Sequence, residues 1–211
     1  NDLTSGYGRS MRPGGWGELR FRVTLANKVL CGTPNNKFGL ATFTLAAWVQ
    51  PTGLPASGNV NAIVTKLAAS GKANYGLLLD NNFAGRDGLC WKGWFETTGT
   101  SPAAFYNTTP NLGEWYHVAT TYDDTAKVFA LYLDGVQVAL TTGVSKTIPT
   151  TPGAVSIGYD GVNAVSGWDG ALDHVRIYNR ALPAQEIREL YVRSLVGHPQ
   201  EFPWTTAPVF F

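Results

Sequence analysis

Short segments with alternating apolar and polar residues, separated by turn formers, run through most of this sequence. An apolar residue at every second position is the pattern of a β-strand with one buried face. The clearest pair is Val128–Leu133 and Val136–Leu140, joined by Asp134-Gly135, a dipeptide typical of a two-residue hairpin. Roughly a dozen such segments, without a repeat of about 20–50 residues, predict an all-β fold of two antiparallel sheets packed as a β-sandwich or jelly roll.

The alternation also predicts which strand residues face the core. The expected strands are residues 19–25, 28–31, 42–50, 62–67, 75–80, 89–96, 113–122, 128–133, 136–140, 154–158 and 172–178. In 42–50, Trp48 lies opposite an apolar face. In 89–96, Trp91 and Phe95 share one face and Trp94 points to the other. Because large aromatic residues dominate cores, we expect Trp91 to be a core residue.

One short helix is expected near the C-terminal end, from Pro183 to Ser194. Pro is well tolerated in a first helical turn, where its missing N–H would have no partner. Ile187, Leu190 and Tyr191 follow at helical spacing, so one side of the helix is apolar. We expect this helix to pack against the strand that precedes it.

Asp173 lies in that preceding strand, and simple alternation places it on the same face as Val175 and Ile177. A carboxylate on an apolar face is costly unless it is hydrogen-bonded or binds a metal. Two interpretations therefore stay open at this point. Either neighbouring backbone N–H groups donate to Asp173, or Asp173 is a ligand of calcium, which prefers carboxylate and carbonyl oxygens.

The chain has 211 residues, which suggests one domain at residues 18–194, an N-terminal arm at 1–17 and a C-terminal tail at 195–211. The net charge is +1 and no basic stripe is present, so nucleic-acid binding is not expected. No apolar run has the ~18–20 residues that a membrane span needs. The chain begins with Asn rather than Met, and we expect a processed product or a segment of a longer protein.

The C-terminal tail combines three prolines with several large apolar side chains. Its aromatic residues are Phe202, Trp204, Phe210 and Phe211. Burying each such side chain stabilises a protein by about 1.5–3 kcal/mol, so a fully exposed tail is not expected. The tail therefore either packs along its own domain or docks on a partner.

The two cysteines, Cys31 and Cys90, both fall in strand-like segments. They form a disulfide if the fold brings their Cα atoms within about 7 Å, and otherwise they are two buried thiols.

Five motifs occur in the order expected for one known family: FTLAAWVQP, EWYHVATTYDD, ALYLDGVQVA, SIGYDG and GWDGALDHVRIYNRALPAQEIRELY. Over residues 19–191 the chain resembles a LamG-like jelly-roll domain of the concanavalin A-like lectin/glucanase superfamily. The resemblance implies a module that is extracellular, on a cell surface or on a virion surface, that binds glycans or proteins, and that holds one structural Ca²⁺.

The resemblance also implies site residues. Asp173 matches the acid in the last-strand motif that often meets calcium, while only Asp2 remains of the usual upstream acidic segment. Glycan binding is expected from aromatic faces and from polar loop side chains. These candidates are Trp94, Tyr106, Tyr159, Asp160, Asn81 and Asn82.

Catalysis is not expected, although glycoside hydrolases share this fold. A retaining glycosidase needs two carboxyl groups about 5–5.5 Å apart. The Glu-x-Asp-x-x-Glu motif of the glucanases is absent from the sequence. Asp169 and Asp173 share a strand face but lie about 13 Å apart if the strand is extended. We therefore predict a non-enzymatic protein, with a glycoside hydrolase as the least favoured alternative.

Two functions remain. The first is an exterior structural, assembly or decoration protein of a virion or other extracellular array, which meets other subunits through the C-terminal tail or N-terminal arm and also contacts glycans. The alternative is a carbohydrate-binding module of a secreted or cell-surface protein. The sequence favours the first, because the tail is apolar and both the upstream calcium ligand and the catalytic pair are missing.

Overall fold

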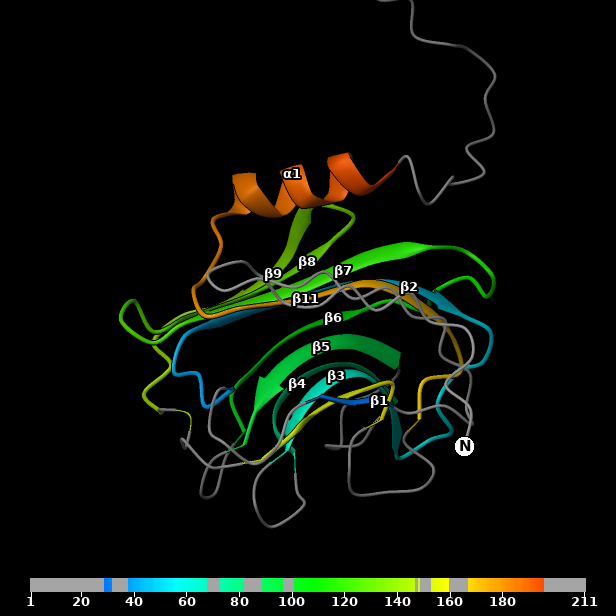
Figure 1. Cartoon of the computed structure of the whole chain (residues 1–211), viewed down its shortest axis with the longest axis horizontal. Coiled ribbons are helices and arrows are strands. Elements are labelled where there is room, and N and C mark those ends of the chain that lie inside the picture. Colours follow the sequence, from blue (N-terminus) through cyan, green and yellow to red (C-terminus); the bar gives the residue numbers. More distant parts are fainter. Residues whose placement is uncertain are drawn as a thin grey trace, which may run out of the picture.

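The computed structural model describes residues 29–31, 38–67, 73–81, 89–96, 101–146, 148, 153–159 and 167–195. Two antiparallel sheets are stacked face to face, and one helix lies over the upper sheet (Figure 1). This arrangement confirms the predicted all-β sandwich with one short C-terminal helix. The predicted strand at 19–25, the N-terminal arm and residues 196–211 of the tail lie outside the described residues.

The sheets contain six and five strands. The first has the order β1 (Val29–Cys31), β10 (Val155–Ile157), β3 (Asn59–Leu67), β4 (Ala73–Asn81), β5 (Leu89–Phe95) and β6 (Ala103–Asn107). The second has the order β11 (Gly170–Tyr178), β2 (Phe43–Pro51), β7 (Tyr116–Asp123), β8 (Val128–Leu133) and β9 (Val136–Thr141). Every neighbouring pair is antiparallel.

The core between the sheets follows the alternation of the sequence. Phe43 on β2 stacks on Tyr75 of β4 with ring centroids 4.6 Å apart, so aromatic rings join the two sheets. Trp91 and Phe95 of β5 are fully buried in the same core, as predicted. Such aromatic pairs contribute roughly 0.5–1.5 kcal/mol each beyond the burial of their area.

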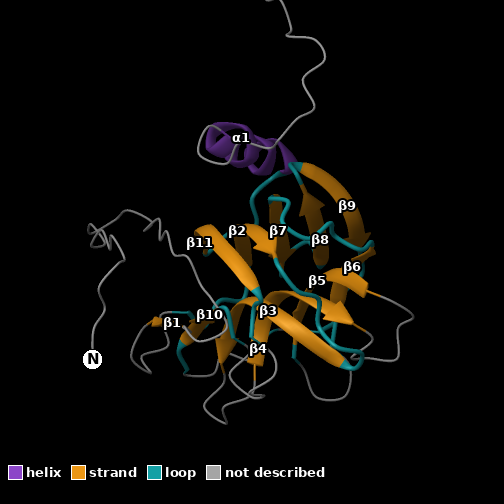
Figure 2. Ribbon diagram, turned by 90° about the vertical axis from the view of Figure 1, so that its right-hand side faces the viewer, coloured by secondary structure: helices purple, strands orange, loops and turns teal. Residues whose placement is uncertain are grey.

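The helix α1 (Ala184–Ser194) covers the outer face of the five-stranded sheet (Figure 2). Three alanines, Ala46, Ala119 and Ala130, lie beneath it and leave room for Ile187, which is fully buried. The start of the helix is fixed by the Leu182 N–H, which donates to Thr44 Oγ1 at 2.9 Å. The predicted packing helix is therefore confirmed.

The end of the helix is held by a tryptophan of the interior strand β2. Trp48 is fully buried on the outer side of the sheet, and its Nε1–H donates to Ser194 Oγ at 2.7 Å. Its ring also stacks on Tyr191 of α1 with centroids 5.6 Å apart. The β8–β9 hairpin turns beside this helix, with Asp134 at φ 50° and Gly135 at φ 75°, as the Asp-Gly signal predicted.

A β-bulge in β11 overturns the predicted orientation of Asp173. The pairing register with β2 shifts between Asp173 and Arg176, and His174 adopts a positive φ of 48°. The extra residue puts both Leu172 and Val175 in the core, whereas Asp173 pairs with Trp48 and faces outward. The prediction that Asp173 shares a face with Val175 was wrong, because a bulge breaks the two-residue period.

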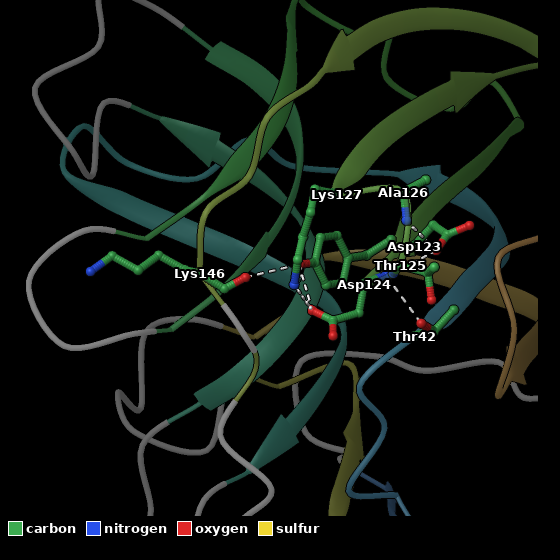
Figure 3. A network of polar contacts seen from close by, with 8 residues as sticks. Thr42, Asp123, Asp124, Thr125, Ala126, Lys127 and Lys146 are labelled. Atoms are coloured by element: carbon green, nitrogen blue, oxygen red, sulfur yellow. Dashed lines mark hydrogen bonds and ion pairs between the residues drawn. The ribbon is translucent and has the colours of Figure 1, made fainter.

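The turn between β7 and β8 is fixed by its own aspartates (Figure 3). Asp123 Oδ1 accepts the N–H groups of Thr125 and Ala126 at 2.8 and 3.0 Å. Asp124 Oδ1 accepts from Lys127 Nζ at 2.8 Å, and this ammonium hydrogen bond lowers the pKa of Asp124. The Asp124 N–H donates to Thr42 Oγ1, which ties the turn to the start of β2. We interpret this network as structural.

The cysteines lie on strands of one sheet that are separated by three others. Cys31 is in β1 and Cys90 is in β5, with β10, β3 and β4 between them. Four strand spacings of about 4.8 Å place the two Cα atoms roughly 19 Å apart. A disulfide between these two residues of one chain is therefore excluded by the strand order.

Candidate functional site

The outer face of the six-stranded sheet is concave and lies away from the five-stranded sheet (Figure 1). We call it the concave face. The registers place one row of side chains across five of its strands: Ser156, Thr65, Gly76, Trp94 and Ala103. A second row, one step along the strands, contains Ala62, Leu78, Lys92 and Phe105.

Trp94 on β5 is the largest side chain of the first row, and it lies against the backbone of β4 at Gly76. A Cβ at Gly76 would come within 3.4 Å of Trp94 Nε1 and 3.0 Å of Thr65 Cγ2. Glycine inside a strand often marks such a close approach. The Trp94 side chain is only half-buried, so the absent side chain at Gly76 lets the indole settle on the concave face while part of it stays accessible.

A buried ion pair lies beside this tryptophan. Lys92 Nζ and Asp80 Oδ2 are 2.6 Å apart, with side chains 9% and 1% exposed. Lys92 is opposite Phe105 of the edge strand β6, whose side chain is 38% exposed on the same face. The concave face thus presents two partly accessible aromatic side chains with a neutralised ion pair next to them.

Three buried polar atoms on this face have no hydrogen-bond partner among the described residues. They are Trp94 Nε1, Asn74 Oδ1 and Ser156 Oγ. The large majority of buried polar side-chain atoms in proteins have a protein or water partner, and an unsatisfied one costs about 1–3 kcal/mol. These three atoms are buried, and no described residue uses their hydrogen-bonding capacity.

The structure does not place Tyr106 and Asn81 beside Trp94, the predicted glycan residue on the concave face. Tyr106 is paired with core-facing Trp91, so it points to the opposite side of the sheet from Trp94. The Asn81 side chain donates to the Pro55 carbonyl at 2.7 Å and supports a loop.

Tyr159 lies two residues after the end of β10 and is partly buried, and its carbonyl accepts from Thr65 Oγ1 at 2.7 Å. The remaining predicted site residues lie outside the described residues: Asn82, Asp160, Phe202, Trp204, Phe210 and Phe211.

Sequence reasoning missed most of the floor of the concave face. Phe105 was missed because the edge strand β6 was not predicted. Gly76 carried a usable signal, since an isolated glycine in an alternating strand indicates a bulge or a close approach. The Lys92–Asp80 pair joins two strands, and its partners could be matched only once the register was known.

Asp173, the predicted calcium ligand, has both carboxylate oxygens close to His174. Asp173 Oδ1 accepts the N–H of His174 at 2.6 Å, and Oδ2 is 3.5 Å from His174 Nδ1. Within the described ranges, no group of three or more His, Cys, Asp or Glu side chains could hold a metal ion. A backbone hydrogen bond therefore accounts for Asp173 Oδ1, and calcium binding at Asp173 stays a prediction.

A family model described as the concanavalin A-like lectin/glucanases superfamily matches residues 26–188, more than half of the chain. The chain belongs to this superfamily. The match confirms the resemblance carried by the five sequence motifs. Within the described residues, no helix of this superfamily member is long and apolar enough to cross a membrane.

Three solved structures illustrate the fold of this concanavalin A-like chain. The carbohydrate-binding module CBM40 of the Ruminococcus gnavus IT-sialidase matches with a TM-score of 0.62 and 12% identity, over 82% of this chain and 96% of that chain. Domain 4 of the extracellular arabinanase AbnA from Geobacillus stearothermophilus, in complex with arabinotriose, matches with a TM-score of 0.58 and 15% identity, over 89% and 86%. A heptameric pentraxin from Limulus polyphemus matches with a TM-score of 0.56 and 16% identity, over 72% and 70%.

Proposed function

We propose that this chain is a non-catalytic carbohydrate-binding module that holds its glycan on the concave face. The observation that carries the proposal is the half-buried indole of Trp94, held against Gly76 with a donor atom that lacks a described partner. Ligand sites combine aromatic surface with a few polar groups that fix orientation. Trp94 and Phe105 offer apolar surface to the C–H face of a sugar ring, and the polar atoms between the strands offer partners to its hydroxyl groups.

Two of the structures with a similar fold contain bound oligosaccharides, which supports this proposal. The R. gnavus module has been seen bound to α2,3 sialyllactose, and the arabinanase domain is in complex with arabinotriose. A shared fold alone does not fix a function, so the proposal depends on the side chains of the concave face. The extracellular origin of the arabinanase agrees with our proposal that this chain also acts outside the cell, on a cell surface or on a virion.

The non-catalytic part of the proposal is supported by the spacing of carboxylates. Asp80 on β4 is opposite Cys90 on β5, and Glu96 lies six residues after Cys90 along the chain. Their carboxylates are therefore about 20 Å apart along the strands. Glycosidases place their two carboxyl groups at about 5–9.5 Å, so these two described carboxylates do not make a catalytic pair.

A glycan array and titration calorimetry with two matched variants test the proposal. Trp94→Ala removes the aromatic surface from the concave face, and we expect at least a tenfold loss of affinity, or about 1.4 kcal/mol. Tyr106→Ala removes an exposed aromatic residue from the opposite side of the sheet and should leave affinity unchanged. Equal losses in both variants, or no binding by the unmodified chain, would overturn the proposal.

The array should be run with calcium and with a chelator, because a structural Ca²⁺ stays a prediction for this superfamily member. Binding that is equal in both conditions would show that glycan recognition does not depend on calcium. Binding that disappears with the chelator would show that glycan recognition depends on a bound metal ion.

The assembly role suggested by the C-terminal tail also stays a prediction. Deletion of residues 196–211 is expected to abolish assembly without unfolding the domain, because α1 and the sandwich are complete before that point. Analytical ultracentrifugation of the full and truncated chains measures the effect. Normal assembly of the truncated chain would exclude the tail as the contact.

A further inference from the structure

We infer that the concave face selects neutral glycans and discriminates against those that carry a carboxylate, such as sialylated or uronic-acid oligosaccharides. The inference rests on the proposed glycan-binding function and deepens it. It follows from the charges of the face and from the kind of polar atom that the face leaves unsatisfied.

Lys92 is the cation among the described side chains of the concave face, and it is already neutralised. Its ammonium lies 2.6 Å from Asp80 Oδ2, and the pair is almost fully buried. A buried ammonium that is drawn away from its carboxylate leaves an uncompensated buried charge, which is strongly unfavourable. Lys92 is therefore held by Asp80 and cannot serve as the cationic partner of an acidic sugar.

Glu96 adds a second negative charge to the same side of the sheet. Its N–H donates to the Asn74 carbonyl at 2.7 Å, which continues the β4–β5 ladder by one residue. Phe95 faces the core, so alternation directs Glu96 to the side of Trp94. With one lysine and two carboxylates, the described part of the face has a net charge of −1 and repels an anionic ligand.

The unsatisfied atoms point to the same preference. Asn74 Oδ1 can only accept a hydrogen bond. A sugar carboxylate at neutral pH can also only accept, so these two groups cannot pair. A sugar hydroxyl both donates and accepts, so it suits Asn74 Oδ1, Ser156 Oγ and Trp94 Nε1, either directly or through one bridging water. A preference for neutral glycans would distinguish this chain from the R. gnavus module, which has a similar fold and has been seen with α2,3 sialyllactose.

Matched pairs of glycans test the inference on the full chain. Each pair is a neutral oligosaccharide and the same oligosaccharide with one added carboxylate, such as lactose with sialyllactose. We expect the neutral member to bind at least tenfold more tightly in calorimetry at low ionic strength. Equal or tighter binding of the acidic members would overturn the inference and leave the proposed function in place. Binding of neither member of any pair would overturn both.

A charge variant provides a second measurement that does not depend on the buried ion pair. Glu96 is exposed, so Glu96→Gln should fold normally, and we expect it to narrow the neutral-to-acidic affinity ratio by roughly twofold to fivefold at low salt. Glu189→Gln on α1 removes the same charge from the other side of the molecule and should leave the ratio unchanged. A ratio that Glu96→Gln does not change would overturn the electrostatic origin of the selection.

Discussion

Trp48 and Trp94 both stand on the outer faces of their sheets, yet their surroundings are opposite. Trp48 is fully buried, and its Nε1–H is bonded to Ser194 of the helix. Trp94 is half-buried, and its Nε1–H has no partner in the described part of the chain. The outer face of the five-stranded sheet is covered by α1, whereas among the described elements no helix covers the concave face.

The neighbours of each tryptophan explain the contrast. Beside Trp48, alanines on three adjacent strands form a shallow surface that accepts a helix. Beside Trp94, a single glycine accepts the indole itself, and the adjoining positions include the buried Lys92–Asp80 ion pair. The row of alanines thus allows α1 to pack on the five-stranded sheet. On the six-stranded sheet, Gly76 alone makes room for the partly accessible side chain of Trp94.

The largest expected effect is on the covered face. Trp48→Ala removes a fully buried ring that packs on Tyr191, and we expect it to lower the free energy of unfolding by about 3–5 kcal/mol. Trp94→Ala should cost less than about 1.5 kcal/mol, because its side chain is only partly buried. Urea denaturation of both variants measures the difference. Similar losses would show that Trp94 is a structural residue as well.

Ser194→Ala would remove the hydrogen-bond acceptor of Trp48 and leave its Nε1–H without that partner, as the Nε1–H of Trp94 is without a described partner. Trp48 Nε1 would lose its acceptor inside the helix–sheet interface, and we expect a loss of about 1–3 kcal/mol. The double variant with Trp48→Phe removes the orphaned donor as well. If the hydrogen bond is the cause, the two changes should be clearly non-additive in a double-mutant cycle.

Gly76→Ala should act on binding more than on stability. The added Cβ would lie 3.0 Å from the Val64 carbonyl and from Thr65 Cγ2, which is tight, and 3.4 Å from Trp94 Nε1, so the neighbours on which the indole rests would have to shift. We expect about 1 kcal/mol of destabilisation together with a severalfold loss of glycan affinity. Gly93→Ala is the matched control, since its Cβ would clash with Thr120 in the core and should reduce stability without changing the affinity of the folded protein.

The smallest expected effect concerns Asp134, which lies beside α1 on the covered face. Burial raises the pKa of Asp134 above 3.8, although a hydrogen bond from the His117 N–H partly opposes the shift. A raised pKa means that the contribution of Asp134 to stability is greatest below pH 3.8 and declines as the pH rises through the folded-state pKa. Asp134→Asn should therefore be more stable than the unmodified chain at neutral pH.

Thermal unfolding between pH 3 and 7 measures this dependence. Asparagine tolerates the positive φ of this turn position, so the substitution does not add backbone strain. Asp124→Asn should be less stable than the unmodified chain at neutral pH, which is the opposite of Asp134→Asn. Lys127 lowers the pKa of Asp124, so the stabilisation that Asp124 contributes is lost as the pH falls. Two variants with the same pH dependence would contradict both assignments.

The fold was predictable because strand period, turn chemistry and family motifs agreed. The hairpin at Asp134-Gly135 and the helix ending at Ser194 were each indicated by residues close together in sequence. The orientation of Asp173 was not, because one extra residue at a bulge shifts the side chains that follow it to the opposite face. Local patterns do not reveal where a bulge will fall.

The candidate site was predictable only in part, and the reason is strand register. Trp94 was identified from alternation within β5, whereas its contact with Gly76 depends on the pairing of β5 with β4. Tyr106 was grouped with Trp94 because both are aromatic, and only the pairing with Trp91 shows that they face opposite sides. A binding face of a sandwich combines residues from several strands, so its composition follows from tertiary structure.

The position of β2 has a consequence for how the protein acquires its fold. β2 lies inside its sheet with β11 on one side, so Thr44 pairs with Tyr178, and Trp48 reaches Ser194 across 146 positions of the chain. Folding that depends on such distant contacts is slow, on the order of milliseconds to seconds. During synthesis on the ribosome, one edge of β2 stays open until β11 has emerged, about 130 residues after Thr44. Among the described elements, α1 is thus the last to close over this hydrophobic surface, and we expect this step to be the most exposed to aggregation.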